Sequence, residues 1–211
     1  MKKLLAILLA AMMLLSLVAC GETVDSESES ESESETDAPV VELAYKSALE
    51  LLETLKNGYN AGAAEEAQLF VAGGNINNFE TTSMDGPAKF VPLADEDYDA
   101  NLGYPAADVA KIDDAASMFN MMNANMFTCY AVHFTNSGDV DAMVETLKTN
   151  ILARQWICGA PEKLVIAKVP GNYLVVVWGV VQSGGIVDPF AASFASSVEG
   201  TEIVVEENIA E

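Results

Sequence analysis

Two neighbouring apolar segments near the C-terminus constrain the fold of this chain more than any other feature. Residues 163–169 and 173–181 are rich in valine, leucine and isoleucine, and a Pro-Gly-Asn sequence at 170–172 separates them. This pattern predicts a β-hairpin. Residues 174–181 are apolar at both odd and even positions, which is typical of a strand buried on both faces. We therefore expect this strand to lie in the centre of a sheet.

The other main elements are predicted from the spacing of apolar residues. Residues 116–122 and 125–135 have strand-like composition and alternation, and a turn joins them. Helical spacing predicts an N-terminal helix over 39–59, a helix over 139–155, and a final helix that begins at residue 188. The order β-β-α-β-β-α after an N-terminal helix predicts an α+β fold. We expect an antiparallel sheet of about four strands with the helices packed on one face.

The folded part of the chain is predicted to begin near residue 38. Residues 38–99 form an N-terminal helical and loop region of the domain, and residues 100–200 form its α+β region. Within the first region, residues 72–105 carry turn sequences and little periodicity. Residues 201–211 are an acidic tail, in which 203–205 has the composition of an edge strand.

The N-terminus carries an export signal. Two lysines precede an apolar run over residues 4–18, and Leu17-Val18-Ala19-Cys20 follows the pattern of an aliphatic residue, two small or modest residues and cysteine. This sequence resembles the lipobox of bacterial lipoproteins. The resemblance implies that residues 1–19 are a signal peptide, and that Cys20 becomes the N-terminus and receives a diacylglyceryl group. The alternative is an ordinary secretory signal with an incidental cysteine.

An acidic segment follows the cysteine. Residues 20–37 contain five consecutive Ser-Glu pairs and only one aliphatic residue after the cysteine, so they are predicted to be a disordered, extended tether. The formal net charge of the chain is -22, and 24 acids against 8 bases from residue 38 onward leave -16 for the domain. Such a surface repels nucleic acid and anionic lipid.

Several motifs in the second half of the chain resemble a known family. They are Met-Met-Asn-Ala at 121–124, a helix of the type Val-x-x-Met-Val-x-x-Leu, and the segment Lys-Val-Pro-Gly-Asn-Tyr-Leu-Val-Val-Val. Together they resemble a Gram-positive lipoprotein family catalogued as domain of unknown function four-three-five-eight, over residues 100–198. The resemblance implies a lipid anchor and a turn at Gly171, Asn172 and Tyr173 between two apolar strands. That family has no assigned activity, so it implies no catalytic residues.

Few residues suggest chemistry. His133, the only histidine, lies in a predicted strand and is either a catalytic base or an ordinary strand histidine that is exposed or hydrogen-bonded. Two cysteines are left once Cys20 is lipidated. In an exported chain Cys129 and Cys158 either form a disulfide or stay as thiols that pack like small apolar side chains.

The best metal candidate is an acidic loop. Asp95, Asp97 and Asp99 alternate as they do at the start of a calcium-binding loop. However, Ala100 replaces the required glycine, and Ala106 at the twelfth position has no oxygen to offer. We therefore expect a solvated loop with no metal and no cofactor.

Methionines gather around residues 118–126. Four of them lie close in sequence to Phe119 and Phe127, so they form either an adaptable binding surface or part of the core.

The sequence favours a non-enzymatic binding or interaction module of the bacterial envelope. We expect it on the extracytoplasmic face of the cell membrane, with the membrane and an envelope protein as partners and no nucleic acid. One alternative is a small-molecule or ion-binding accessory lipoprotein, which needs a pocket with convergent polar groups. Another is an envelope hydrolase, which needs paired carboxylates from 72–105. An exposed apolar patch favours the interaction module.

Overall fold

The structure is a computed structural model of the 211-residue chain, and it describes residues 45–182 and 184–209. The predictions for the signal peptide, for Cys20 and for the tether lie outside the described residues. Among the helices that are described, none is long and apolar enough to cross a membrane.

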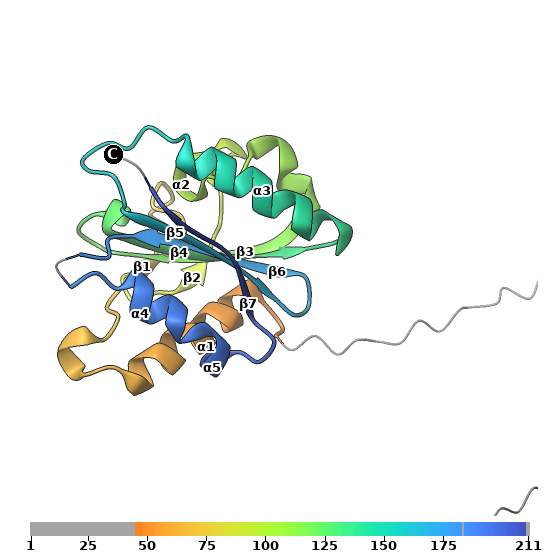
Figure 1. The fold of residues 1–211 in the computed structure, drawn as a ribbon. Helices are drawn as coiled ribbons and strands as arrows, with labels where there is room; N and C mark the ends of the chain where they lie inside the picture. The colour runs from red at the N-terminus through yellow and green to blue at the C-terminus, as the bar shows by residue number, and fades with distance from the viewer. Residues whose placement is uncertain (1–44, 183, 210–211) are drawn as a thin grey trace, which may run out of the picture. The chain divides into compact units, whose positions relative to one another are not determined.

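A seven-stranded antiparallel sheet forms the centre of the domain (Figure 1). The strand order is β1-β3-β4-β6-β5-β7, and β2 pairs with β3 beside β1. The strands are β1 Ala72–Gly73, β2 Ala88–Lys89, β3 Ile112–Phe119, β4 Phe127–Phe134, β5 Lys163–Val169, β6 Tyr173–Gly179 and β7 Glu202–Asn208.

The α+β fold with an antiparallel sheet is confirmed, but the expected four strands are too few. The predicted strands correspond to β3, β4, β5 and β6. The two-residue strands β1 and β2 are too short to show alternation in the sequence. In the predicted acidic tail, β7 pairs with β5 at the sheet edge, and only its residues 203–205 were expected to form a strand.

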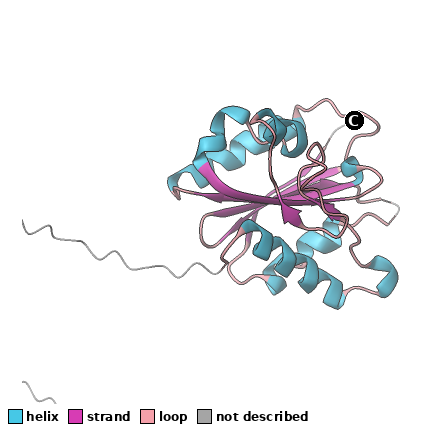
Figure 2. Cartoon of the chain, turned by 180° about the vertical axis from the view of Figure 1, so that it is seen from behind, coloured by secondary structure: helices cyan, strands magenta, loops and turns pink. Residues whose placement is uncertain are grey.

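Helices cover both faces of the sheet, which corrects the prediction of one covered face (Figure 2). One layer contains α1 Ala48–Gly62, α4 Val187–Ala192 and α5 Phe194–Ser197, and the other contains α2 Glu96–Leu102 and α3 Gly138–Leu152. Short 3-10 helices occupy Glu65–Ala67, Ala106–Lys111 and Ala124–Met126. Two hydrophobic cores result, because alternate residues of β4 and β6 point into opposite layers.

The central strand β6 is buried along its whole length, as its apolar sequence predicts. Val175 and Val177 point into the core under α1, whereas Val176 and Trp178 point into the core under α3. Because both faces of this strand are apolar, both need a covering layer. The sequence therefore already contained the signal for helices on both faces.

Helix α3 matches its prediction closely. The expected buried stripe is confirmed, and it consists of Val140, Met143, Val144, Leu147 and Ile151.

Helix α1 begins and ends later than predicted. Ser47 starts it by accepting a hydrogen bond from the Glu50 amide at 3.1 Å. Gly58 lies inside the helix. A Cβ atom at this position would lie 2.1 Å from Ser197 Oγ, so the glycine permits α1 to approach α5 closely.

Asparagine side chains organise the loop after β1. Asn75 is fully buried, and its Nδ2 donates to Asp97 Oδ2 at 2.8 Å and to the Val91 carbonyl at 3.2 Å. Its Oδ1 accepts from Asn101 Nδ2 at 3.2 Å. Buried polar groups need such partners. The turn-rich segment 72–105 is thus held to the domain by side-chain hydrogen bonds rather than by long regular elements.

Candidate functional site

The candidate site begins at an irregularity in β3. The pairing of β3 with β4 shifts between Ile112 and Asp114, so that Asp113 is an extra, bulged residue. Bulges re-aim side chains and are common beside functional sites. In register, Asp114 pairs with His133, which in turn pairs with Tyr173 of β6. The bulge thus brings two aspartates to the one histidine of the chain.

His133 and Asp113 form a close pair. The distance from Nδ1 to the Asp113 Oδ1 is 2.5 Å, while the His133 side chain is 16% exposed. A carboxylate can only accept, so Nδ1 carries a proton, and Nε2 is an acceptor whenever the ring is neutral. Nε2 is buried and has no hydrogen-bond partner among the described residues. The Tyr173 ring packs against the imidazole at a centroid distance of 4.7 Å.

Asp114 connects the sheet to α1. Its Oδ2 accepts a hydrogen bond from the Ala48 amide at 2.7 Å, and its Oδ1 lies 3.5 Å from Lys89 Nζ. A carboxylate at a helix N-terminus is favoured both by the unpaired amides and by the helix dipole. Asp114 therefore fixes where the first turn of α1 sits above the histidine.

A surface pocket of about 440 Å³ opens at this point. Its polar lining comes from five separate parts of the chain, which are Lys46 and Ser47 before α1, Lys89 of β2, Asp113 and Asp114 of β3, His133 of β4, and Tyr173 of β6. Lys46 forms no ion pair with any residue that the structure describes. The pocket therefore presents two ammonium groups beside two carboxylates.

Tyr173 provides a hydroxyl that stays protonated. Its Oη donates to the Tyr45 carbonyl at 3.3 Å. Burial is the main cause that raises the pKa of Tyr173 to about 12, and the charges of Asp114 and Asp113 raise it further. At neutral pH this group is a donor, not an anion.

The pocket lacks the hydrogen bond that nucleophilic catalysis needs. In a Ser-His-Asp arrangement the serine hydroxyl contacts the second ring nitrogen. Ser47 lines the pocket, but its Oγ accepts from the Glu50 amide as the cap of α1. Within residues 45–182 and 184–209, no hydroxyl or thiol forms a hydrogen bond with His133. The pair of His133 and Asp113 suits recognition of a polar group.

The sequence-predicted turn residues contribute to this site. Gly171 and Asn172 have φ angles of 87° and 64°, which is typical of the tight turns that join hairpin strands. The Asn172 carbonyl accepts from the Phe134 amide at 2.9 Å, which holds the turn against the end of β4. The turn thereby sets Tyr173 beside His133.

The disulfide considered from the sequence is not formed. Cys129 and Cys158 are both free thiols. Cys129 is fully buried in the core under α1, whereas Cys158 is exposed in the loop between α3 and β5. Burial raises the pKa of the Cys129 thiol well above its usual range.

The acidic segment at residues 95–99, expected to be a solvated loop, forms the start of helix α2 and has a structural role. Asp97 accepts hydrogen bonds from the Leu93 amide at 2.7 Å, and from the side chains of Asn75 and Asn77. The Leu93 hydrogen bond is the main cause that lowers the pKa of Asp97. Asp95 and Asp99 are exposed and flank it. No group of three or more potential metal ligands occurs among the residues that the structure describes.

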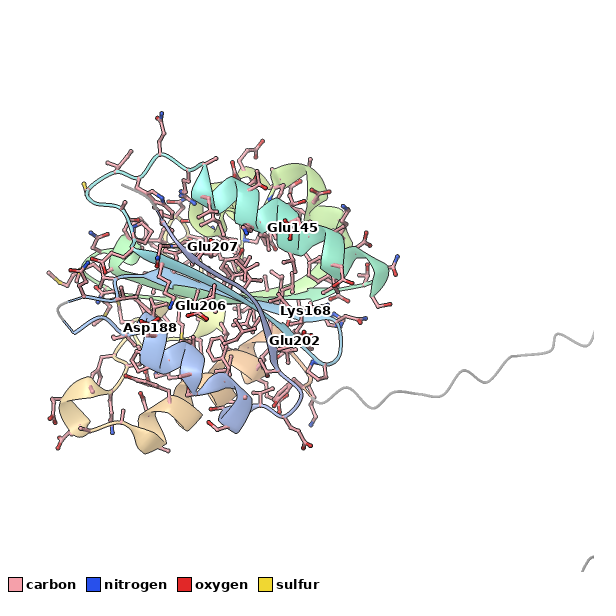
Figure 3. All side chains as sticks on the ribbon, in the orientation of Figure 1. Glu145, Lys168, Asp188, Glu202, Glu206 and Glu207 are labelled. Carbon is pink, nitrogen blue, oxygen red and sulfur yellow. The ribbon has the colours of Figure 1, made fainter. Side chains whose placement is uncertain are left out.

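A second set of charges follows the edge strand β7 (Figure 3). Lys163 contacts Asp188 of α4 and Glu206 at 2.5 Å each, and Lys148 of α3 contacts Glu207 at 2.5 Å. Adjacent glutamates of β7 thus pair toward opposite helical layers. These ion pairs secure the sheet edge and leave few charges free for a ligand.

No protein-family model, no curated protein and no solved structure matches this chain. The pocket itself therefore carries the functional argument.

Sequence reasoning missed most of the pocket. It singled out His133 and Tyr173, but not the two lysines or the two aspartates. The adjacent acids at 113 and 114 stand just before the strand that was predicted from residue 116, and this was the one local signal. The lysines come from sequence positions 46 and 89, which only the fold brings together.

The six tyrosines of the chain supply a pH test of the fold. Each has a raised pKa, with burial as the main cause. A raised folded-state pKa stabilises the fold fully below about pH 10, and this contribution is lost as the pH rises through the folded-state value. We expect near-ultraviolet phenolate absorbance of the folded protein to rise well above pH 10, together with unfolding. In denaturant the phenolate absorbance should rise near pH 10. If the tyrosines of the folded protein also titrated near pH 10, their burial in this fold would be contradicted.

Proposed function

We propose that this chain is a lipid-anchored binding module on the extracytoplasmic face of a Gram-positive cell membrane, and that it binds a small polar ligand beside His133. The observation that carries the proposal is the pocket of about 440 Å³ in which two lysines, two aspartates and the histidine converge. Binding sites combine a concave surface with a few oriented polar groups. The lipobox-like sequence at residues 17–20 supports the anchor and the location.

The charges of the pocket point to a zwitterionic ligand, such as a free amino acid or a short peptide. Lys46 and Lys89 are exposed and suit a carboxylate. Asp113 is about half exposed and suits an ammonium group. Two lysines and two aspartates cancel in formal charge, so a ligand with both signs can pair with each without leaving an unpaired charge. His133 Nε2 has no partner among the described residues and can accept a hydrogen bond from a donor group of the ligand.

The binding proposal is tested by calorimetric titration of the purified protein. The probes are glycine and dialanine, with acetate and methylammonium as ligands of one charge only. We expect measurable binding of a zwitterion and at least about a tenfold loss of affinity in Asp113→Asn and in Lys46→Gln, since each removes one charged partner. Lys111→Gln is the matched control, because Lys111 pairs with Asp108 and does not line the pocket. Equal binding by all variants would refute the assignment.

The hydrolase alternative has less support. It needs two carboxylates of segment 72–105 in one cleft, with environments that separate their pKa values. Within that segment Asp97 has a lowered pKa, and its carboxylate already accepts hydrogen bonds from the Leu93 amide and from the side chains of Asn75 and Asn77.

A further inference from the structure

Three methionines and an isoleucine are exposed at the end of the sheet opposite the pocket. Met121 and Met122 follow β3, Met126 precedes β4, and Ile157 lies in the loop between α3 and β5. Met122 is 91% exposed and Ile157 is 80% exposed. We call these four side chains the apolar tip. Exposed apolar groups of this size in one place mark interaction sites more often than single scattered residues do.

Asparagines hold the apolar tip in one conformation. Asn125 Nδ2 donates to the carbonyls of Ile157 and Gly159 at 2.7 and 2.8 Å, and Asn123 Nδ2 donates to the Cys158 carbonyl at 3.2 Å. These bonds join the two loops that carry the tip. Asn120 Oδ1 accepts from the Met122 amide at 2.9 Å. A surface ordered in advance loses less entropy when it binds.

The loop between β3 and β4 carries no charge, and the charged residues of the loop between α3 and β5 are Arg154 and Glu162, near its two ends. Residues 115–138, 155–161 and 169–187 contain no Asp, Glu, Lys or Arg, although the chain has 32 acids. Depletion of charge and enrichment of methionine are typical of the centre of a protein interface. The acidic composition of the rest of the domain therefore does not extend to the apolar tip.

The position of the tip argues for a protein partner. The described chain begins at Tyr45, whose carbonyl contacts Tyr173 at the pocket end of the sheet. The tip lies at the other end of β3, β4 and β6, about 25 Å away for strands of this length (Figure 1). The tip therefore lies at the end of the sheet opposite Tyr45, the first described residue.

The acidity of the domain restricts the class of partner that the tip can bind. A second copy would bring two strongly acidic domains together, and an anionic bilayer would repel the same acids. We infer that the apolar tip is a docking surface for a second envelope protein of different sequence, which offers an apolar recess with a neutral or basic rim. This inference uses the anchor of the proposed function but not its ligand pocket.

The test uses the full lipidated chain in intact cells. Cys158 lies between Ile157 and Gly159 in the tip and is exposed, so a thiol-to-amine crosslinker attached there reaches lysines on the partner rim. We expect one crosslinked protein whose yield falls at least about tenfold in Met122→Asp. Met84→Asp should leave the yield unchanged, because Met84 is an exposed methionine outside the tip.

Three outcomes would overturn the inference. The first is a crosslinking yield equal to that of the wild type in the double variant Cys158→Ser, Ser196→Cys. This variant moves the thiol from the tip to Ser196, which is exposed on α5. The second is a crosslinked dimer of this chain, and the third is crosslinking to aminolipid alone. Asp113→Asn separates the two proposals: it removes a pocket charge and should not change the crosslinking yield, so either proposal can fail without the other.

Discussion

Replacing Cys20 with alanine is expected to move nearly all of the protein from the membrane fraction into the medium. Cys20 carries the thiol that would receive the diacylglyceryl group, and alanine has no group that can replace it. The acyl chains would supply the membrane affinity, about 0.8 kcal/mol for each buried methylene. Membrane fractionation and mass measurement of the N-terminal peptide check this result.

Cys158→Ala is the matched control for that experiment, because it removes an exposed thiol far from the signal sequence. It should leave the protein in the membrane fraction. A Cys20→Ala protein that stayed with the membrane, and a wild-type N-terminal peptide without acyl groups, would each show that the lipobox assignment is wrong.

Phe190→Ala is expected to lower the free energy of unfolding by about 3–5 kcal/mol. Phe190 is fully buried, and its ring makes edge-to-face contacts with Tyr59 of α1, Phe127 of β4 and Phe194 of α5. Removing it leaves a cavity where α4, α1 and the sheet meet, and such aromatic contacts stabilise beyond the area they bury. Urea unfolding of both proteins measures the difference.

Phe79→Ala provides the matched comparison, since Phe79 is 85% exposed and the substitution removes the same atoms. It should change the free energy of unfolding by less than about 0.5 kcal/mol. If both variants lost the same stability, the packing of α4 on this face of the sheet would be wrong.

The sequence predicted those parts of the fold whose apolar pattern is local. The hairpin of β5 and β6, strand β4 and the buried stripe of α3 all follow from periodicity. Strand β3 was placed several residues too late, because Asn120 ends it by turning the chain, as its side chain accepts hydrogen bonds from two following amides. Helix α1 was placed too early at its N-terminus, because Ser47 and Asp114 together fix its first turn.

The rest of the fold depends on contacts between distant segments. Strands β1 and β2 exist because they pair with β3, and their own two residues carry no pattern. Strand β7 has the composition of an acidic tail, and it is held at the sheet edge by pairing with β5 and by ion pairs from Lys163 and Lys148. The sequence of β6 indicates burial of both of its faces, but the prediction of helices on one face did not take this into account.

The candidate site was predictable only in part. A lone histidine in a strand is a weak signal, and its meaning comes from register: Asp114 lies opposite it, and a bulge adds Asp113. Register and bulges are set by the whole sheet and cannot be deduced from one strand. The methionines divide between the two alternatives that the sequence left open, because Met118 is buried in the core whereas Met121, Met122 and Met126 are exposed.

The most direct test of the central claim is the NMR spectrum of the His133 imidazole during ligand titration. The chain has one histidine, so one set of ring nitrogen and carbon signals reports on the pocket. The account predicts that glycine or dialanine shifts these signals in wild-type protein and in Lys111→Gln, and that the shift needs a much higher concentration in Asp113→Asn. Signals that did not move with any zwitterion, or that moved equally in Asp113→Asn, would contradict a ligand pocket at His133.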